Sequence, residues 1–232
     1  MLEALRTEVY EANLELVRRG LVIYTFGNAS GIDRARGLLA IKPTGVPYEK
    51  MTPADMVITD LEGRVVEGNL RPSSDLDTHI ALYRAFPTIG GIAHTHSRHA
   101  TSWAQAGREI PCFGTTHADY FHGPVPVTEP LTPAEIESGY EANTGVAIIR
   151  RMAGRDPLGC PAVLVAGHAP FCWGESASAA AHAAVILEEL AAMAFQTLTI
   201  NPGTTPISES LRDKHHFRKH GPTASYGQKK TP

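Results

Sequence analysis

The sequence predicts an α/β fold in which helices cover a mixed sheet within one domain. Short apolar segments that are typical of strands alternate with longer segments whose apolar residues recur at helical spacing. The alternation follows no regular strand–helix–strand repeat, and no low-complexity segment or interdomain linker divides the 232 residues. A chain of this length is within the range of one large domain, and its 43% hydrophobic residues can form a sizeable core.

The first part of the chain predicts one helix followed by four short strands. Apolar residues recur every three or four positions over residues 2–16, and a helix with this stripe would end at Gly20. Strands are predicted at 21–25, at the apolar start of 38–45, and in two short runs on either side of Gly63.

The rest of the chain predicts two helices and two more strands. Residues 73–86 begin with two serines and an early acid, as a capped helix does, and 176–195 form a long alanine-rich helix. The apolar runs 89–96 and 162–168 are expected to be strands, and each ends in histidine. The last thirty or so residues are rich in Pro, Gly, Ser and charge, which indicates a partly ordered tail.

Charge and cysteine content narrow the class of protein. A formal net charge of −3 suggests no nucleic-acid or membrane-surface partner. Glu3, Arg6 and Glu8 stand where a signal peptide would need an unbroken apolar core. The alanine-rich stretch 177–195 contains charged residues and is a poor membrane span. The three cysteines form no C-x-x-C pair, and a reducing cytoplasm is the simplest expectation.

The histidines at the two strand ends indicate a metal site. His94 and His96 are two residues apart, so on a strand they project from the same face, whereas His99 is expected on the following helix, facing elsewhere. If the strand ending in His168 lies in the same sheet, three imidazoles can meet at its edge. Three protein ligands with an open position are typical of catalytic zinc. The alternative is that H-x-H is only a pair of polar residues at a strand end.

Three clusters of small and polar residues indicate a phosphate site. They are "GNAS" (27–30), "KPTG" (42–45) and "PSSD" (72–75), and the last one precedes a predicted helix. Small residues let backbone N–H groups approach an anion, and helix N-termini favour negative charge. Each cluster alone could be an ordinary turn or cap. None matches the P-loop or the dinucleotide-binding fingerprint.

These motifs resemble those of one known family. "GNAS", "IKPTGV", "PSSD", "HTHSRHAT", "GTTHADYF", "GHAPF" and the terminal "KHHFRKHG…YGQ" are similar, in order and spacing, to motifs of the class II aldolase/adducin family. The resemblance runs from residue 2 to about residue 228. It implies a three-layer α/β/α domain over residues 1–232 with a mostly antiparallel central sheet. It also implies a homotetramer in which the tail from about residue 205 contributes to a neighbouring active site.

The resemblance is strongest to the epimerases of this family and implies their activity. The reaction would invert C4 of L-ribulose 5-phosphate and give D-xylulose 5-phosphate in the cytoplasm. C4 is not adjacent to the C2 carbonyl, so enolisation cannot invert it, and retro-aldol cleavage of C3–C4 followed by re-addition is implied. One Zn²⁺ per subunit would act as the Lewis acid, with other divalent metals possible. The pathway, through arabinose, ascorbate or another pentose, stays open.

Two other functions are open to this chain. One is a sugar-phosphate aldolase of the same family, which would act on fuculose or rhamnulose phosphate. Such aldolases carry Glu near the position of Asp75 here. The other is a non-catalytic binding module like the adducin head, which has this fold without the metal, and the intact histidines argue against it.

The resemblance also implies roles for individual residues. The metal would be held by His94, His96 and His168, with Asp75 as a ligand or close partner. Substrate phosphate would bind at Gly27, Asn28, Lys42, Thr44, Gly45, Ser73 and Ser74. Asp119 and Tyr226 would be the two acid/base groups, and Thr115, Glu141, His215 and Arg218 match secondary active-site positions. The chain departs from the pattern at Thr44, where the family commonly has Ser, and at Ala166, where epimerases often have His.

Overall fold

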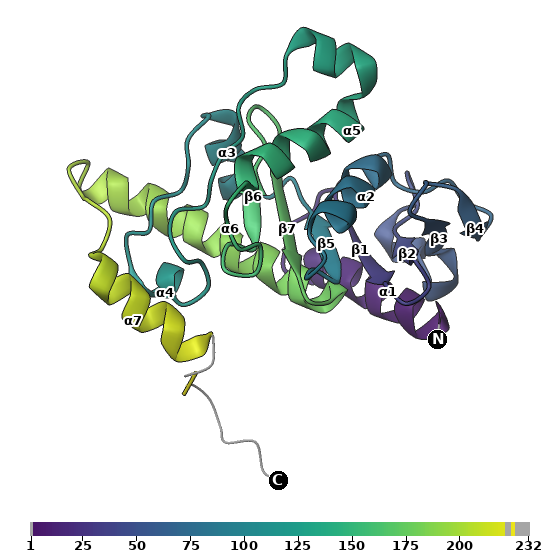
Figure 1. The fold of residues 1–232 in the computed structure, drawn as a ribbon, viewed down its shortest axis with the longest axis horizontal. Helices are drawn as coiled ribbons and strands as arrows, with labels where there is room; N and C mark the ends of the chain where they lie inside the picture. The colour runs from purple at the N-terminus through teal and green to yellow at the C-terminus, as the bar shows by residue number, and fades with distance from the viewer. Residues whose placement is uncertain (1, 221–223, 226–232) are drawn as a thin grey trace.

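The computed structural model describes residues 2–220 and 224–225, and within them seven strands form one sheet (Figure 1). The strands are β1 Asn28–Asp33, β2 Leu38–Ile41, β3 Val57–Asp60, β4 Val65–Glu67, β5 Gly91–His94, β6 Ala162–Leu164 and β7 Pro170–Gly174. Their order across the sheet is β4-β3-β2-β1-β5-β7-β6, and each neighbouring pair is antiparallel.

The predicted α/β class and the mostly antiparallel sheet are therefore confirmed, whereas a mixed sheet is wrong. The pairs β1–β2, β3–β4 and β6–β7 are each joined by a short turn, which allows only antiparallel neighbours. In the described part of the chain, parallel pairing is limited to an isolated bridge between Val127 and Leu164.

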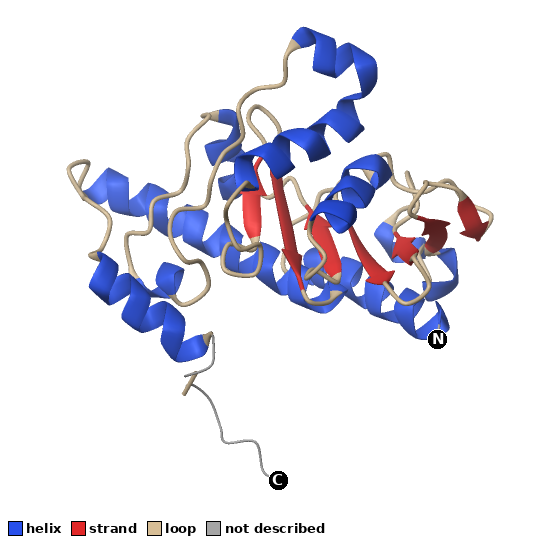
Figure 2. Cartoon of the chain, viewed as in Figure 1, coloured by secondary structure: helices blue, strands red, loops and turns tan. Residues whose placement is uncertain are grey.

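Helices cover both faces of the sheet (Figure 2). They are α1 Leu2–Arg18, α2 Leu76–Ala85, α3 Arg98–Gln105, α4 Thr115–Ala118, α5 Pro133–Met152, α6 Ala177–Ile200 and α7 Glu209–Lys219, with 3₁₀ turns η1 Tyr48–Lys50 and η2 Pro53–Asp55. Neighbouring residues of β1 point to opposite faces, so they identify the two layers. Gly31 faces Val9 of α1 and Ala177 of α6, whereas the Ser30 hydroxyl bonds to His79 and Tyr83 of α2.

The second layer is completed by α5, which packs on α2. The core lies between these layers and includes Leu39, Ile58, Ile92 and Phe171, all fully buried. Among the described helices, α6 alone is long and apolar enough to cross a membrane by length and composition, which differs from the expectation for residues 177–195, but it packs on the sheet along β5 and β7. The three-layer α/β/α arrangement follows from these contacts.

The strand predicted at 21–25 is wrong, because this segment is an irregular loop. Tyr24 has a positive φ of 53°, outside the β region, and Ile23, Tyr24 and Phe26 are 56%, 86% and 56% exposed. The first strand instead starts at Asn28, where both of its edges are paired. The segment instead joins α1 to β1 as a loop whose apolar side chains pair with no strand.

Other parts of the chain add to or differ from the sequence-based expectation. The tail predicted to be partly ordered contains the helix α7, whose N-cap Ser208 accepts a hydrogen bond from the Leu211 amide. The helices α4 and α5 were not predicted. The serines before α2 do not cap it: the N-cap position is Asp75, whose side chain makes no capping bond, while Ser73 Oγ accepts from the Asp75 amide. The Asp75 carboxylate is therefore available to the site described next.

Candidate active site

Three imidazoles converge where β5 and β7 lie side by side. His94 is the last residue of β5, His96 follows it by two residues, and His168 lies in the turn between β6 and β7. The Nε2 atom of His94 lies 3.1 Å from Nε2 of His96 and 3.2 Å from Nε2 of His168. The three histidines lie together, as predicted. Both strands end earlier than expected, and the strand next to β5 is β7 rather than β6.

The spacing of these nitrogens fits a divalent metal ion. Two nitrogens that one tetrahedral ion holds at about 2.0–2.1 Å lie roughly 3.3 Å apart. His94 Nδ1 lies 2.9 Å from the Pro170 carbonyl oxygen and must donate to it, so the lone pair of its Nε2 faces the other two rings. Burial, followed by the neighbouring imidazoles, lowers the pKa of His168 to about 4, which keeps that ring neutral, as a metal ligand must be.

Asp75 lies beside the histidines at the start of α2. Its Oδ2 atom accepts a hydrogen bond of 2.6 Å from the Asn28 side-chain amide. Burial alone would raise the pKa of Asp75, but His94, His79 and the Asn28 hydrogen bond together hold this pKa below its usual value. The side chain is therefore an ionised carboxylate that can balance a metal charge. The buried Oδ1 of Asn28 accepts no hydrogen bond from any described residue.

A cavity of about 450 Å³ contains the histidines and the predicted phosphate-binding residues. Every predicted metal and phosphate residue lines it, together with the secondary residue Glu141. The lining is Thr25, Phe26, Gly27, Asn28, Lys42, Pro43, Thr44, Gly45, Ser73, Ser74, Asp75, His94, His96, Tyr140, Glu141 and His168. The loop before β1, the turn after β2 and the start of α2 thus meet at one hollow, as the three small-residue clusters predicted.

Lys42 is a buried cation in this cavity. Its side chain is 2% exposed, and its ammonium contacts the carbonyl oxygens of Thr25 at 3.2 Å and Pro43 at 3.4 Å and the ring of Tyr48 at 4.6 Å. Burial lowers the pKa of the Lys42 ammonium to about 8. These contacts include no carboxylate, so an anion in the cavity would supply the charge that the ammonium lacks.

The hydroxyl groups of the cavity are better placed to bind an anion than two of its backbone amides. The Thr44 amide already donates to the Arg71 carbonyl at 3.0 Å, and the Ser73 amide donates to the Lys42 carbonyl. Ser73 Oγ accepts from Asn28 Nδ2 at 3.1 Å and from the Asp75 amide, which leaves its own hydrogen free to donate. Thr44 and Ser73 can therefore contact a phosphate through their side chains.

A second group of predicted residues comes together around Asp119, at the end of α4. One carboxylate oxygen lies 3.1 Å from His215 Nδ1, and the carboxylate accepts hydrogen bonds of 3.0–3.2 Å from Arg218, with Lys219 at 3.4 Å. Burial would raise the pKa of Asp119, but the Arg218 and His215 bonds hold it below its usual value. The Thr115 carbonyl accepts from the Asp119 amide at 2.9 Å.

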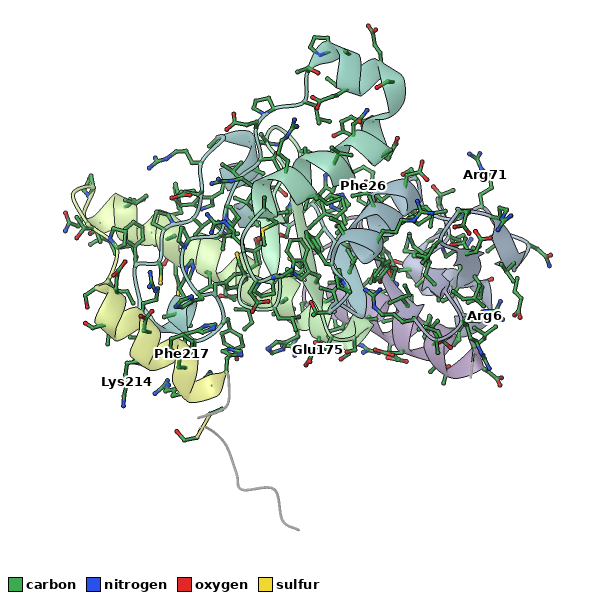
Figure 3. All side chains as sticks on the ribbon, viewed as in Figure 1. Arg6, Phe26, Arg71, Glu175, Lys214 and Phe217 are labelled. Atoms are coloured by element: carbon green, nitrogen blue, oxygen red, sulfur yellow. The ribbon has the colours of Figure 1, made fainter. Side chains whose placement is uncertain are left out.

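This second group lies away from the cavity. None of its four predicted members is among the cavity-lining residues. Figure 3 shows the separation: Phe26, at the cavity, lies on the upper right, while Phe217, on α7, lies on the lower left. Tyr226 lies outside the described residues. The structure therefore brings the predicted site residues together as two groups rather than one.

Comparison with known proteins gives the family. Residues 7–195 match the model of the class II aldolase and adducin N-terminal domain, which is well over half of the chain. The chain belongs to this family. The match includes all the cavity residues and, of the second group, Thr115 and Asp119; it ends before α7, which carries His215 and Arg218.

Relatives of this class II aldolase/adducin chain include epimerases and aldolases. It is 53% identical over 228 residues to the L-ribulose-5-phosphate 4-epimerase UlaF of Salmonella typhi, covering 98% of this chain and 100% of the relative. A solved L-fuculose 1-phosphate aldolase is 25% identical, with a TM-score of 0.80 over 93% of this chain and 95% of that one. YgbL of Klebsiella pneumoniae, a putative aldolase/epimerase/decarboxylase, has the same fold at 24% identity, with a TM-score of 0.74 over 93% and 99%.

Sequence reasoning missed two tyrosines of this family member's site. The Tyr140 ring lies 5.9 Å from the His168 ring and lines the cavity, next to Glu141. It directly follows Gly139, whose φ of 144° breaks α5 into two helical parts, and a glycine inside a helical pattern was the available signal. Tyr48 lies behind the cavity, under Lys42, and no local motif marks it.

Proposed function

We propose that this chain catalyses the Zn²⁺-dependent epimerisation of L-ribulose 5-phosphate at C4, giving D-xylulose 5-phosphate. The observation that carries the proposal is one cavity lined both by three converging imidazoles and by a buried lysine that pairs with no carboxylate among the described residues. A phosphorylated sugar matches both groups: its adjacent oxygens suit a metal held by the imidazoles, and its phosphate suits the lysine. The 53% identity to curated epimerases over nearly the whole chain supports this substrate.

The cavity residues would hold the sugar at its two ends. Lys42 and the hydroxyls of Thr44 and Ser73 bind the C5 phosphate. When bound at His94, His96 and His168, the metal supplies Lewis acidity that polarises the sugar carbonyl and stabilises the negative charge of the retro-aldol step.

Inversion at C4 follows from keeping one fragment tethered. Cleavage of C3–C4 leaves a three-carbon enediolate and glycolaldehyde phosphate, whose phosphate stays on Lys42. The aldehyde turns about this anchor and presents its other face, after which the C3–C4 bond re-forms. The C4 hydroxyl loses its proton on one side and regains it on the other, so an acid/base group is needed on each side.

Asp119 and Tyr226 would be these two groups. Asp119 suits proton abstraction because Arg218 and His215 keep it ionised and fix its orientation. It lies outside the cavity of its own chain. We therefore place it at the cavity of a neighbouring subunit, in a homotetramer whose C-terminal segment from about residue 205 also reaches that site. Oligomers are usually closed and symmetric, so each subunit would both give and receive this surface.

The cell compartment follows from the substrate and the thiols. Sugar phosphates are intracellular metabolites, and the three cysteines are free and buried in the structure. A cytoplasmic enzyme agrees with both.

Aldol condensation is the second candidate activity. The likeness to L-fuculose 1-phosphate aldolase favours it, because the cleavage step is common to both reactions. The two functions differ in what happens to the aldehyde fragment, which an aldolase releases and an epimerase turns and re-adds. Release of free glycolaldehyde phosphate as the main product would favour the aldolase.

The direct test uses the purified, zinc-loaded protein and L-ribulose 5-phosphate, with products followed by NMR. D-Xylulose 5-phosphate should form, formation should stop after metal chelation, and added Zn²⁺ should restore it. Turnover that is unaffected by complete metal removal would refute the proposal, and so would the absence of D-xylulose 5-phosphate from the loaded protein.

A further inference from the structure

Tyr48 lies behind the proposed phosphate site and contacts two of its parts. Its side chain is 3% exposed at the start of η1. Its hydroxyl lies 3.1 Å from the Phe26 carbonyl oxygen and 3.0 Å from the Gly27 carbonyl oxygen, and its one hydrogen is shared between them. The Lys42 ammonium lies 4.6 Å from the centre of the Tyr48 ring. One buried side chain thus joins the loop before β1 to the lysine after β2.

The hydroxyl of Tyr48 fixes the direction of backbone groups in that loop. The C=O and N–H of a trans peptide point in opposite directions, and the described residues contain no cis peptide. Holding the Phe26 carbonyl therefore orients the Gly27 N–H, and holding the Gly27 carbonyl orients the Asn28 N–H. The loop needs such an anchor, because residues 21–27 are irregular and Phe26 is 56% exposed.

The ring of Tyr48 stabilises the charged form of Lys42. A cation over an aromatic face is attracted by the ring quadrupole, and the attraction is larger where water is excluded. Burial raises the pKa of Tyr48, so its phenol stays protonated and keeps donating to the carbonyls at any pH the enzyme meets. The ring and the hydroxyl therefore act on different parts of the same anion site.

We propose that Tyr48 is a positioning residue for substrate phosphate: its hydroxyl sets the loop at residues 26–27, and its ring holds the Lys42 ammonium toward the cavity. This inference rests on the proposed function, because it assumes that the cavity binds the phosphate of a sugar. It gives Tyr48 no part in the bond-making steps, and Tyr48 is absent from the cavity lining.

The first test is Tyr48→Phe, which removes the hydroxyl and keeps the ring. In calorimetry with inorganic phosphate on the zinc-loaded protein, the Kd should rise about three- to tenfold, the range for loss of one hydrogen bond. KM for L-ribulose 5-phosphate should rise by the same factor with kcat little changed, because a uniform binding interaction is lost. Zinc content should equal that of the parent.

A second variant, Tyr48→Leu, also removes the ring. Lys42 should then lose its proton more readily, so phosphate affinity should decline at a pH roughly half a unit to one unit lower than in the parent. In Tyr48→Phe, which keeps the ring, phosphate affinity should decline at the same pH as in the parent. This difference would not arise if Tyr48 only filled space in the core.

The matched control is Tyr83→Phe. Tyr83 is 1% exposed, and its hydroxyl makes a buried hydrogen bond of 2.8 Å to Ser30, which lies on β1 but does not line the cavity. It should leave phosphate affinity unchanged. Equal phosphate affinity in Tyr48→Phe and the parent would overturn the role of Tyr48 but leave the proposed function standing. A parent that binds no inorganic phosphate would instead refute the phosphate site itself, and with it the proposed function.

Discussion

His94 is oriented by the hydrogen bond of its Nδ1, which makes it the fixed point of the candidate metal site. Nδ1 donates to the Pro170 carbonyl on the neighbouring strand, and Nε2 faces His96 and His168 at 3.1 and 3.2 Å. A ligand that is already oriented needs no rearrangement to bind. The stacked ring of Phe171, at 4.2 Å between centroids, further restricts its rotation.

Removing one of the other ligands should remove the metal. His96→Asn is expected to lose most bound zinc and nearly all turnover, because two imidazoles cannot replace three and the reaction needs the Lewis acid. His99→Asn is the matched control, since His99 lies on α3, outside the cavity lining. Elemental analysis of both purified variants checks this, and full zinc in His96→Asn would contradict the ligand set.

The depressed pKa of Lys42 predicts how phosphate affinity depends on pH. Only the ammonium form attracts the anion, and with a pKa of about 8 in the free protein this form is lost as pH rises through that value. Affinity for inorganic phosphate should therefore fall between pH 7.5 and 9.5, by up to about tenfold per pH unit. Lys42→Arg keeps its charge over this range and should show a flat profile by calorimetry. A flat profile in the parent would show that Lys42 does not titrate there.

The role of Asp119 can be separated from metal binding. Asp119→Asn should lose about 10²–10⁴ in epimerisation, the usual contribution of one positioned acid/base group, while it keeps zinc. It should retain some condensation of dihydroxyacetone with glycolaldehyde phosphate, because bond formation needs a proton donor on one face only. Both reactions are assayed in parallel on the same preparation. Parent-level epimerisation would exclude Asp119 from the catalytic pair.

At the scale of elements, the site forms because the ends of three neighbouring interior strands, β1, β5 and β7, lie together. The strand β5 ends at His94, the turn before β7 carries His168, and β1 begins at Asn28, which pairs with His94. The cavity is therefore built mainly on turns at the ends of paired strands. Such an arrangement holds the ligands in place through the sheet rather than through the turns themselves.

The junction of β5 and α6 should be sensitive to the smallest added side chain. A Cβ atom at Gly91 would overlap the backbone of Ser176 and Ala177, at the start of α6. Gly91→Ala is expected to lower the free energy of unfolding by about 1–3 kcal/mol or more, since backbone cannot move aside as a side chain can. The matched substitution Gly114→Ala meets nothing within 4 Å at an extended φ of −151° and should be nearly neutral. Urea denaturation of both variants measures the difference, and equal stabilities would contradict this packing.

The elements whose signals are local could be predicted from sequence. The helix α1, the strands β2, β3 and β4, and the histidine cluster follow from apolar periodicity and residue spacing. The strand predicted at 21–25 is wrong because a run of apolar residues is typical of a strand, but a strand forms only where the segment can pair with another strand. Local propensity carries no information about that competition.

The grouping of Asp119 with α7 could not have been predicted by such means. Asp119 and His215 are 96 residues apart in the chain, and their contact depends on how a charged helix docks on a short one. The resemblance to the family identified Asp119 and His215 as site residues. From their spacing alone, both would have been predicted to be ordinary surface residues. The charges that mark α7 as a tail in the sequence are the groups that surround Asp119 in the structure.

At the scale of the whole molecule, the two residue groups lie on different parts of the surface (Figure 1). The helices α4 and α7 occupy the lower left of the view, while β1, β2 and α2, which border the cavity, lie to the right. A site that needs both groups must therefore be completed by a second copy of the chain. This is the central claim of the proposed function, and it can be tested without a structure of the assembly.

The test is complementation between two inactive variants, His96→Asn and Asp119→Asn. When both are co-expressed with different affinity tags and purified as mixed tetramers, some sites should combine an intact cavity from one subunit with an intact Asp119 from its neighbour. Random mixing should restore about one quarter of the parent's epimerase activity. Each variant alone should remain at its own low rate. If every site were complete within one chain, each subunit would carry a defect, and mixed tetramers no more active than the separate variants would contradict the shared site.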